Sequence, residues 1–305
     1  MCGADGVEQY KALTDRMFGA PGGWNLRRCV RRECGLIWQD PMLSDEQLES
    51  AYANYFTHEE QAEASDSASL GVVRRLKYLV YPPRRFEDQF PMNLVLPTAG
   101  RRYLDVGCGG GADLRKMKSA GWQVCGVESD PKSLERLRRL GLDVRRGTLE
   151  QQKFTDDAFD AITMGHVIEH VARPAALLGE CRRILAPGGV LIVTTPNSAS
   201  LGHRLFGVSW AHLDPPRHRY IFNASTLGRL AREAGFSTCR VVSTARYAGF
   251  VFIASNAIKH CGSYDWNETR RAGTPLGARL WEFAEWALVK AGSSLGEEIL
   301  LSASK

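Results

Sequence analysis

The chain has 305 residues, which is the length of one large or two modest domains and is enough to bury a core. Apolar residues make up 44% and charged residues 24%, values that exclude disordered, collagenous and coiled-coil chains. The net charge of +5 is spread as arginine pairs along the chain, which argues against a nucleic-acid partner. Because the apolar runs are too short for a membrane span and the start lacks a signal-peptide pattern, we expect a cytoplasmic protein.

Three blocks follow one another along the chain. Residues 1–60 carry cysteine, arginine and tryptophan in no regular pattern, so we expect an irregular N-terminal extension. Residues 61–100 are polar, then basic and proline-containing, which is typical of a linker or helical segment. A regular pattern begins at residue 101 and predicts one domain over 101–305, with a helical insertion at about 247–296. The eight cysteines lack a secreted framework, so we expect reduced thiols.

Strand and helix signals alternate in the regular block. The expected strands are residues 103–106, 122–127, 142–145, 159–164, 190–195 and 239–243, with a turn at 186–189. The expected helices are residues 112–120, 131–140 after an Asp130 cap, 174–185, and one capped at Ser225 and ended by Gly235. Alternation of this kind predicts a doubly wound α/β fold, in which helices cover both faces of a parallel sheet.

A glycine-rich loop follows the first of these strands. In an open α/β sheet, ligands bind outside the carboxyl ends of the strands. The loop contains Gly107, Gly109 and Gly111, and glycine lets the backbone approach a ligand closely. The same spacing fits the dinucleotide-binding pattern, and Glu128 ends the second strand where a ribose-binding acid is expected. An NAD-dependent oxidoreductase is therefore one alternative.

Asp105 favours a different ligand. A carboxylate two residues before the first glycine suits a sulfonium and an amine better than a pyrophosphate. Here the sequence resembles the class I S-adenosylmethionine-dependent methyltransferases, whose signature is an acidic residue followed by Gly-x-Gly-x-Gly. Residues 127–130, 159–163 and 185–189 resemble three further motifs of that family, in the same order. The resemblance implies a Rossmann-like, mostly parallel seven-stranded sheet whose last strand, residues 298–302, is antiparallel.

The resemblance also implies cofactor-binding residues for S-adenosylmethionine. Asp105 and His166 would lie near its methionine part, Gly107, Gly109 and Gly111 near methionine and ribose, Glu128 at the ribose hydroxyls, and Thr148 and Leu149 beside the adenine. A carboxylate can accept two hydrogen bonds at once, so Glu128 suits the paired hydroxyls of a ribose.

Two patterns bear on metal binding. Residues 166–170 spell H-x-x-E-H, a zinc-protease pattern, but they directly follow a buried strand, so we expect a structural or cofactor-edge role. The N-terminal block resembles the zinc-ribbon-like start of some of these enzymes. Its three thiols, Cys2, Cys29 and Cys34, cannot fill a closed tetrahedral site. We therefore expect no bound metal.

The segment after the fifth strand is a candidate acceptor loop. It runs Trp210-Ala-His-Leu-Asp214-Pro-Pro-Arg217-His218 and resembles the small-molecule branch of ubiquinone-biosynthesis and sugar methyltransferases. A rigid Pro-Pro loop with convergent polar groups suits an acceptor pocket. We expect Trp210, Asp214 and Arg217 to bind the acceptor and His218 to be the catalytic base, since histidine titrates near neutral pH. A capped loop with a merely hydrogen-bonded histidine is the alternative.

The helical insertion contains an amphipathic segment. Leu280, Trp281, Ala284, Ala287 and Leu288 share a broad face, which we expect to pack on the domain or to roof the acceptor pocket. Taken together, the sequence predicts methyl transfer from S-adenosylmethionine to a small-molecule acceptor, with oxygen as the expected acceptor atom. A non-catalytic S-adenosylmethionine-binding module is a further alternative.

Overall fold

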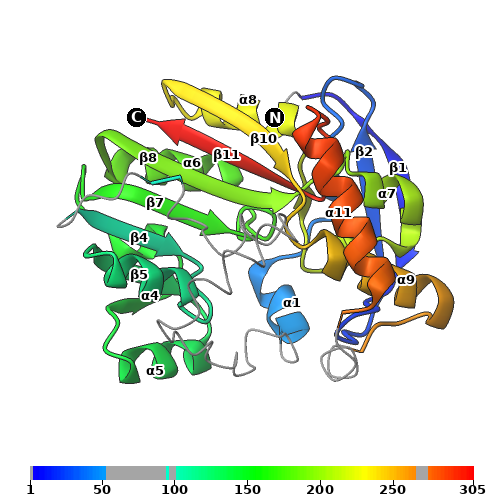
Figure 1. Cartoon of the computed structure of the whole chain (residues 1–305), viewed down its shortest axis with the longest axis horizontal. Coiled ribbons are helices and arrows are strands. Elements are labelled where there is room, and N and C mark those ends of the chain that lie inside the picture. Colours follow the sequence, from blue (N-terminus) through cyan, green and yellow to red (C-terminus); the bar gives the residue numbers. More distant parts are fainter. Residues whose placement is uncertain (1–2, 53–93, 96–100, 266–273) are drawn as a thin grey trace.

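The computed structural model describes residues 3–52, 94–95, 101–265 and 274–305. The predicted linker at 61–100 lies outside these residues apart from 94–95, as do residues 266–273 of the predicted insertion. The described part forms a seven-stranded sheet and a smaller four-stranded sheet (Figure 1).

The seven-stranded sheet carries the predicted domain. Its strands are β4 (Arg102–Val106), β5 (Gln123–Glu128), β6 (Val144–Arg146), β7 (Phe159–Gly165), β8 (Leu185–Pro196), β10 (Thr238–Thr244) and β11 (Glu298–Ser304). Their order is β10-β11-β8-β7-β4-β5-β6, and β11 is antiparallel to both of its neighbours. The strands from β8 to β6 are parallel to one another. This arrangement confirms the predicted doubly wound, mostly parallel fold with an antiparallel last strand.

Helices cover both faces of this sheet (Figure 1). The helices are α4 (Ala112–Ser119) and α5 (Pro131–Arg139) on one face, and α6 (Pro174–Ile184) and α8 (Ala224–Glu233) on the other. Adjacent strand residues point to opposite faces, so one strand serves both cores. In β4, Tyr103 packs in the core that contains Leu114, while Leu104 packs in the core that contains Leu178.

Two helix starts test the predicted caps. Asp130 caps α5 by accepting hydrogen bonds from the backbone of Lys132 and Ser133, as predicted. The predicted cap of α8 is wrong, because Asn223 rather than Ser225 caps that helix. Asn223 forms a capping box with Thr226, which satisfies two backbone donors at once, whereas the Ser225 hydroxyl bonds elsewhere.

The predicted turn at 186–189 lies inside β8. Phe159 of β7 pairs with Leu185, and Ala161 pairs with Val190, so the extra residues are absorbed as a register shift. Gly188 has a φ of +71°, a backbone conformation that glycine adopts at little cost. The prediction of a separate turn was therefore wrong, and the residues form an irregularity within one long strand.

The N-terminal extension is more regular than predicted. It contributes β1 (Gly6–Leu13), β2 (Trp24–Cys29) and β3 (Ile37–Gln39), which form an antiparallel sheet together with β9 (Tyr220–Ile221). The helices α1 (Asp45–Glu49) and η1 (Ser50–Tyr52) follow. Because β3 pairs with a strand from the distant loop after β8, the sequence pattern of the extension alone does not reveal the sheet.

The small sheet shares a core with the predicted acceptor loop. Leu26, Ile37, Phe206, Trp210 and Val251 belong to one buried cluster. The helical elements of this region are α7 (Leu201–Phe206), η5 (Gly207–Ser209), η6 (Ala211–Leu213), α9 (Ala248–Cys261) and α11 (Leu276–Lys290). One further short helix, η4 (Glu150–Gln152), belongs to the large domain instead. The extension, the acceptor loop and the insertion therefore form one packed unit beside the large sheet.

Helix α11 differs from its predicted packing. Leu280 is 61% exposed and Leu288 is 42% exposed, whereas Ala278 and Glu285 are buried. The predicted apolar face therefore packs only in part: Trp281 stacks on Phe252 of α9 with the ring centroids 5.3 Å apart, whereas Leu280 and Leu288 stay exposed. Within the described ranges, no helix combines the length and the apolar character needed to cross a membrane.

Candidate functional site

The glycine loop lies at the carboxyl edge of the large sheet. The backbone N–H groups of Gly107 and Cys108 donate to the Val127 carbonyl over 2.8 and 3.2 Å, which ties the loop to β5. A Cβ at Gly109 would meet no heavy atom within 4 Å, so the loop faces open space there. A Cβ at Gly107 would lie 2.3 Å from Val167, so the loops after β4 and β7 pack directly together.

Glu128 joins two loops at this edge. Its Oε1 accepts from the backbone of Ser129 and Asp130 over 2.8 and 3.0 Å, and its Oε2 accepts from the backbone of Gly109 over 2.7 Å. A carboxylate has about four acceptor sites, so it can also accept from ribose hydroxyls. With the open space at Gly109, these residues fit the ribose end of S-adenosylmethionine.

Three other predicted cofactor residues lie in contrasting surroundings. Asp105 is buried and accepts a 2.9 Å hydrogen bond from Thr163, and burial raises the pKa of its carboxyl well above the usual range. Leu149 packs in the core at 1% exposure, whereas Thr148 is exposed. Asp105 and Leu149 therefore lie within the protein beside the expected site.

His166 lies between two buried carboxylates. Its Nδ1 is 3.1 Å from Glu169 and its Nε2 is 2.9 Å from Glu298. Burial alone lowers the pKa of His166, but the hydrogen bonds to the two carboxylates outweigh it and raise the pKa to about 9. For Glu169, burial alone would raise the pKa of the carboxyl, but the hydrogen bond to His166 outweighs burial and lowers that pKa to about 2. The ring is therefore an imidazolium at neutral pH.

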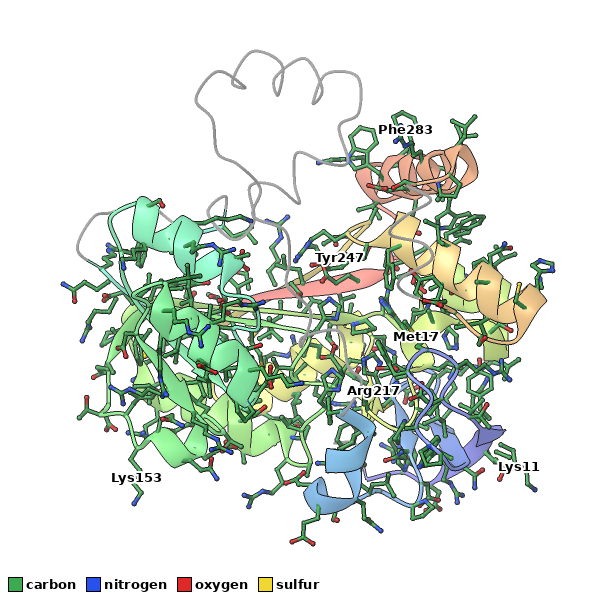
Figure 2. The ribbon with its side chains drawn as sticks, turned by 90° about the horizontal axis from the view of Figure 1, so that it is seen from below. Lys11, Met17, Lys153, Arg217, Tyr247 and Phe283 are labelled. Atoms are coloured by element: carbon green, nitrogen blue, oxygen red, sulfur yellow. The ribbon has the colours of Figure 1, made fainter. Side chains whose placement is uncertain are left out.

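Residues that the sequence analysis missed surround this histidine. Thr244 donates to Glu298 over 3.1 Å, and the Arg246 guanidinium is 3.6 Å from the same carboxylate. The Tyr247 ring lies edge-on to His166 at 5.6 Å, with Arg246 over its face. In Figure 2, Tyr247 lies in the middle of the view, between the green half of the large sheet and the N-terminal strands drawn in blue. The one signal in the sequence for this group of residues was the adjacent pair Glu297 and Glu298, directly before the apolar residues of the last strand.

The predicted acceptor residue Trp210 bonds within the protein. Its side chain is 1% exposed, and its indole N–H donates to Glu297 over 2.8 Å. The indole also stacks on the His203 ring at 4.5 Å between centroids. Trp210 therefore fixes the acceptor loop to the residue that precedes β11.

Arg217 is also committed to protein partners. Its guanidinium makes two hydrogen bonds to Asp15, at 2.8 and 2.9 Å, and further bonds to Asp214 and to the Ala51 carbonyl. The side chains of both Arg217 and Asp15 are almost completely buried. Asp15 lies 202 positions earlier in the chain, so sequence spacing offered no signal for this pairing.

His218 lies next to a second histidine at the same loop. Its Nδ1 is 2.7 Å from the His212 carbonyl, and because a carbonyl only accepts, Nδ1 carries a proton, which leaves Nε2 as the lone-pair nitrogen of the neutral ring. Nε2 lies 3.8 Å from Asp214. The ring of His170 packs edge-on at 4.7 Å, and its Nδ1 contacts the Arg217 carbonyl and the Tyr52 hydroxyl. Burial lowers the pKa of His170 to about 4, so this neighbour is neutral.

Metal-ligating side chains also come together here. Glu169, His170 and His218 each place one ligand atom within 4.8 Å of the others. The Glu169 carboxylate already accepts from His166 and, over 3.0 Å, from Thr195. In the N-terminal block, the buried Cys34 thiol accepts from Arg229, and Cys2 lies outside the described residues. The expected absence of metal stays a prediction.

Comparisons with known proteins identify the domain. Residues 74–241 match the family described as a methyltransferase domain. A ubiquinone biosynthesis O-methyltransferase of Maricaulis maris is 34% identical over 163 residues, which cover 49% of this chain and 64% of that protein. A probable S-adenosylmethionine-dependent methyltransferase of Mycolicibacterium smegmatis is 31% identical over 176 residues, which cover 57% of this chain and 65% of that protein. The chain thus spans less than two thirds of the length of these two relatives.

A solved structure agrees on the fold. The S-adenosylmethionine-dependent methyltransferase from Archaeoglobus fulgidus superposes with a TM-score of 0.50 and 16% identity. The superposition covers 76% of this chain and 99% of that chain. At this identity the likeness shows the shared fold alone.

Proposed function

The chain belongs to the family of methyltransferase domains, and from that premise we propose that it methylates a hydroxyl oxygen of a small-molecule acceptor. Membership of this family decides against the NAD-dependent alternative. When bound, S-adenosylmethionine supplies a methyl group that is already activated on a sulfonium sulfur. The name of the Maricaulis maris relative, an O-methyltransferase, supports oxygen as the acceptor atom.

The cofactor side is proposed to work through the glycine loop and Glu128. Glu128 would accept the ribose hydroxyls while its bonds to three backbone N–H groups hold it in place. Gly107, Gly109 and Gly111 would line the methionine and ribose parts, and Thr148 would lie beside the adenine. Asp105, Leu149 and His166 would shape the site from within the protein.

The observation that carries the proposal on the acceptor side is the orientation of His218. Its Nδ1 proton is held by the His212 carbonyl, so the Nε2 lone pair is available to take the acceptor hydroxyl proton. Removal of that proton makes the oxygen a nucleophile for the methyl carbon. Asp214, 3.8 Å from Nε2, would stabilise the imidazolium that forms. Since their polar groups bond within the protein, Trp210 and Arg217 would position this loop.

The acceptor class and location complete the proposal. Positive charge is scattered along the chain rather than clustered on one element, which supports a small molecule rather than a nucleic acid. The reduced cysteines expected from the sequence support a cytoplasmic location.

The test measures transfer of a labelled methyl group to a panel of phenols and sugars. His218→Ala is expected to lower turnover by ~10²–10⁴-fold, while the dissociation constant of S-adenosylmethionine changes only a few-fold. Glu128→Ala is instead expected to act on cofactor binding and to weaken it by at least ~10-fold. Normal turnover by His218→Ala would assign His218 a structural role.

His203→Ala is the matched control. His203 is also buried, and its Nδ1 also contacts a carbonyl, that of Ser198, but its Nε2 bonds to the Tyr10 hydroxyl. Its removal is expected to change stability more than turnover. A wild-type protein that binds the cofactor but methylates none of the panel would favour the non-catalytic binding module, and failure to bind it would overturn the proposed function.

A further inference from the structure

Two adjacent glutamates, Glu297 just before β11 and Glu298 at its first position, contact different parts of the site. Successive residues of an extended strand point to opposite sides. Glu297 accepts from Trp210 over 2.8 Å and from Ser200 over 3.1 Å, which places it on the acceptor-loop side. Glu298 reaches His166 over 2.9 Å, at the end of β7. Both side chains are fully buried.

The contacts of His166 require a positive charge. A neutral imidazole has one N–H, so it could donate to only one of the two carboxylates that face its ring nitrogens. Glu169 and Glu298 are acceptors at 3.1 and 2.9 Å, and both distances suit a donated N–H. His166 therefore donates from both nitrogens and carries a full charge.

The charges around His166 balance. The imidazolium and the Arg246 guanidinium supply two positive charges, and Glu169 and Glu298 supply two negative ones. The two carboxylates are fully buried and the two cations largely so, which limits screening by water, so removal of any one charge changes the potential nearby. Glu298 contacts both cations and is therefore central to the balance.

This balanced group lies against the glycine loop. Val167, the residue after His166, packs on Gly107 so closely that a Cβ there would lie 2.3 Å away. Asp113, at the start of α4 just after the loop, lies in the field of Arg246: burial raises the pKa of Asp113, and the charges of Lys116 and Arg246 oppose that rise. The four charges therefore act on the methionine side of the expected cofactor site.

We propose that Glu298 is a positioning residue that tunes the cofactor site for the positive sulfonium of S-adenosylmethionine over the neutral sulfur of its demethylated product. Glu298 does so by cancelling the charge of His166 and Arg246 while it holds the His166 ring. This inference rests on the proposed function, since it requires S-adenosylmethionine as the ligand. It assigns a functional role to a residue of the last strand.

The test compares Glu298→Gln with Glu297→Gln by calorimetry with S-adenosylmethionine and with S-adenosylhomocysteine. At pH 6, His166 keeps its proton through Glu169, so Glu298→Gln leaves one uncompensated positive charge. We expect Glu298→Gln to weaken S-adenosylmethionine binding by ~10-fold and to leave S-adenosylhomocysteine within ~2-fold. Glu297→Gln changes a neighbour of equal size and burial, and because burial raises the pKa of Glu297 to about 7, this control removes little charge at pH 6 and should leave the ratio of the two dissociation constants unchanged.

A second variant is expected to shift the ratio of the two dissociation constants in the opposite direction. Arg246→Gln removes a positive charge, so S-adenosylmethionine should gain ~10-fold over S-adenosylhomocysteine. If Glu298→Gln fails to fold, the ratio of dissociation constants measured for Arg246→Gln tests the proposal in its place. Equal weakening of both ligands, an unchanged ratio in the charge variants, or an equal change in Glu297→Gln would overturn the proposal. Failure of the wild-type protein to bind either ligand would instead contradict the proposed function.

Discussion

The cofactor side and the acceptor side of the site are assembled in different ways. Glu128 meets Gly109 across 19 positions of the chain, within one strand-loop-helix-strand unit. The acceptor loop is held by Asp15, 202 positions from Arg217, and by Glu297, 87 positions from Trp210. The ribose end of the cofactor side is therefore built from local contacts, whereas the acceptor loop depends on contacts between distant segments.

The two sides also differ in the groups that pair with their charged side chains. Glu128, which is 8% exposed, accepts from neutral backbone N–H groups of the two loops. On the acceptor side, Arg217 is fully buried between Asp15 and Asp214. A buried ion of this kind is strongly destabilising when its partner is lost, because the remaining charge has no water to solvate it. Mutations should therefore affect folding most on the acceptor side and ligand binding most on the cofactor side.

The largest expected effect is that of Arg217→Met. This change leaves Asp15 and Asp214 buried without their cation, so we expect the free energy of unfolding to fall by about 3–5 kcal/mol. Urea unfolding measures the loss. The matched control is Arg27→Met. Arg27 also pairs with an aspartate, Asp40, but both side chains of this pair are more than 40% exposed. Exposed pairs contribute about 0–1 kcal/mol, so similar losses in the two variants would contradict this contrast.

A pH-dependent effect should come next in size. Because the folded pKa of His166 is raised to about 9, its contribution to stability is complete below the unfolded value of ~6.5 and is lost between there and pH 9. The lowered pKa of Glu169, about 2, acts in the other direction and adds stability above pH ~4.5 that is lost on acidification. We expect the titration of His166 to lower wild-type stability by on the order of 2–3 kcal/mol from pH 6.5 to 9.5, and the raised pKa of Glu285, about 9, to lower it further over the same range.

His166→Gln isolates this effect, since it removes the titrating ring. Urea titrations of the variant should show a decline between pH 6.5 and 9.5 that is smaller than in the wild type by the share of His166, since Glu285 still titrates there. A decline of the same size in the variant would mean that other groups account for it.

This difference between the two sides explains what the sequence could predict. The alternation of strands and helices, the Asp130 cap and the glycine loop depend on local patterns, and the structure has them as expected. The small sheet was missed because β3 pairs with β9 across most of the chain. Trp210 and Arg217 were expected to contact the acceptor because their chemistry suits a pocket, but a motif does not show which partners a side chain meets after folding.

Local patterns also misled in two places. Ser225 is a good cap by type, but Asn223, two residues earlier, forms the capping box. The apolar face of α11 was expected from its helical period to pack inward, but only Trp281 of that face stacks on α9 while Leu280 is exposed, because a period shows only which residues share a face. Which face is buried depends on neighbours such as α9 and on the buried Glu285.

A smaller effect tests the open space at the glycine loop. Gly109→Ala and Gly141→Ala place a side chain at φ values of +47° and +66°, and neither Cβ would meet an atom within 4 Å. Both should lose about 1 kcal/mol of stability from backbone strain alone. Cofactor affinity should fall by ~10-fold only in Gly109→Ala, because Gly141 follows α5 away from the loop. An equal affinity loss in both would mean that strain, and not the filled space, weakens binding.

The smallest effect is expected on α11. Leu280 is 61% exposed, so Leu280→Ser should change the free energy of unfolding by less than about 0.5 kcal/mol, the usual size of a surface change. Ala278, two residues earlier on the same helix, is fully buried, so Ala278→Leu should cost about 1–3 kcal/mol through overpacking. Urea unfolding of the two variants compares them directly. A loss above 1 kcal/mol for Leu280→Ser would restore the packing predicted from the helical period, because only a covered leucine loses that much when it is replaced by serine.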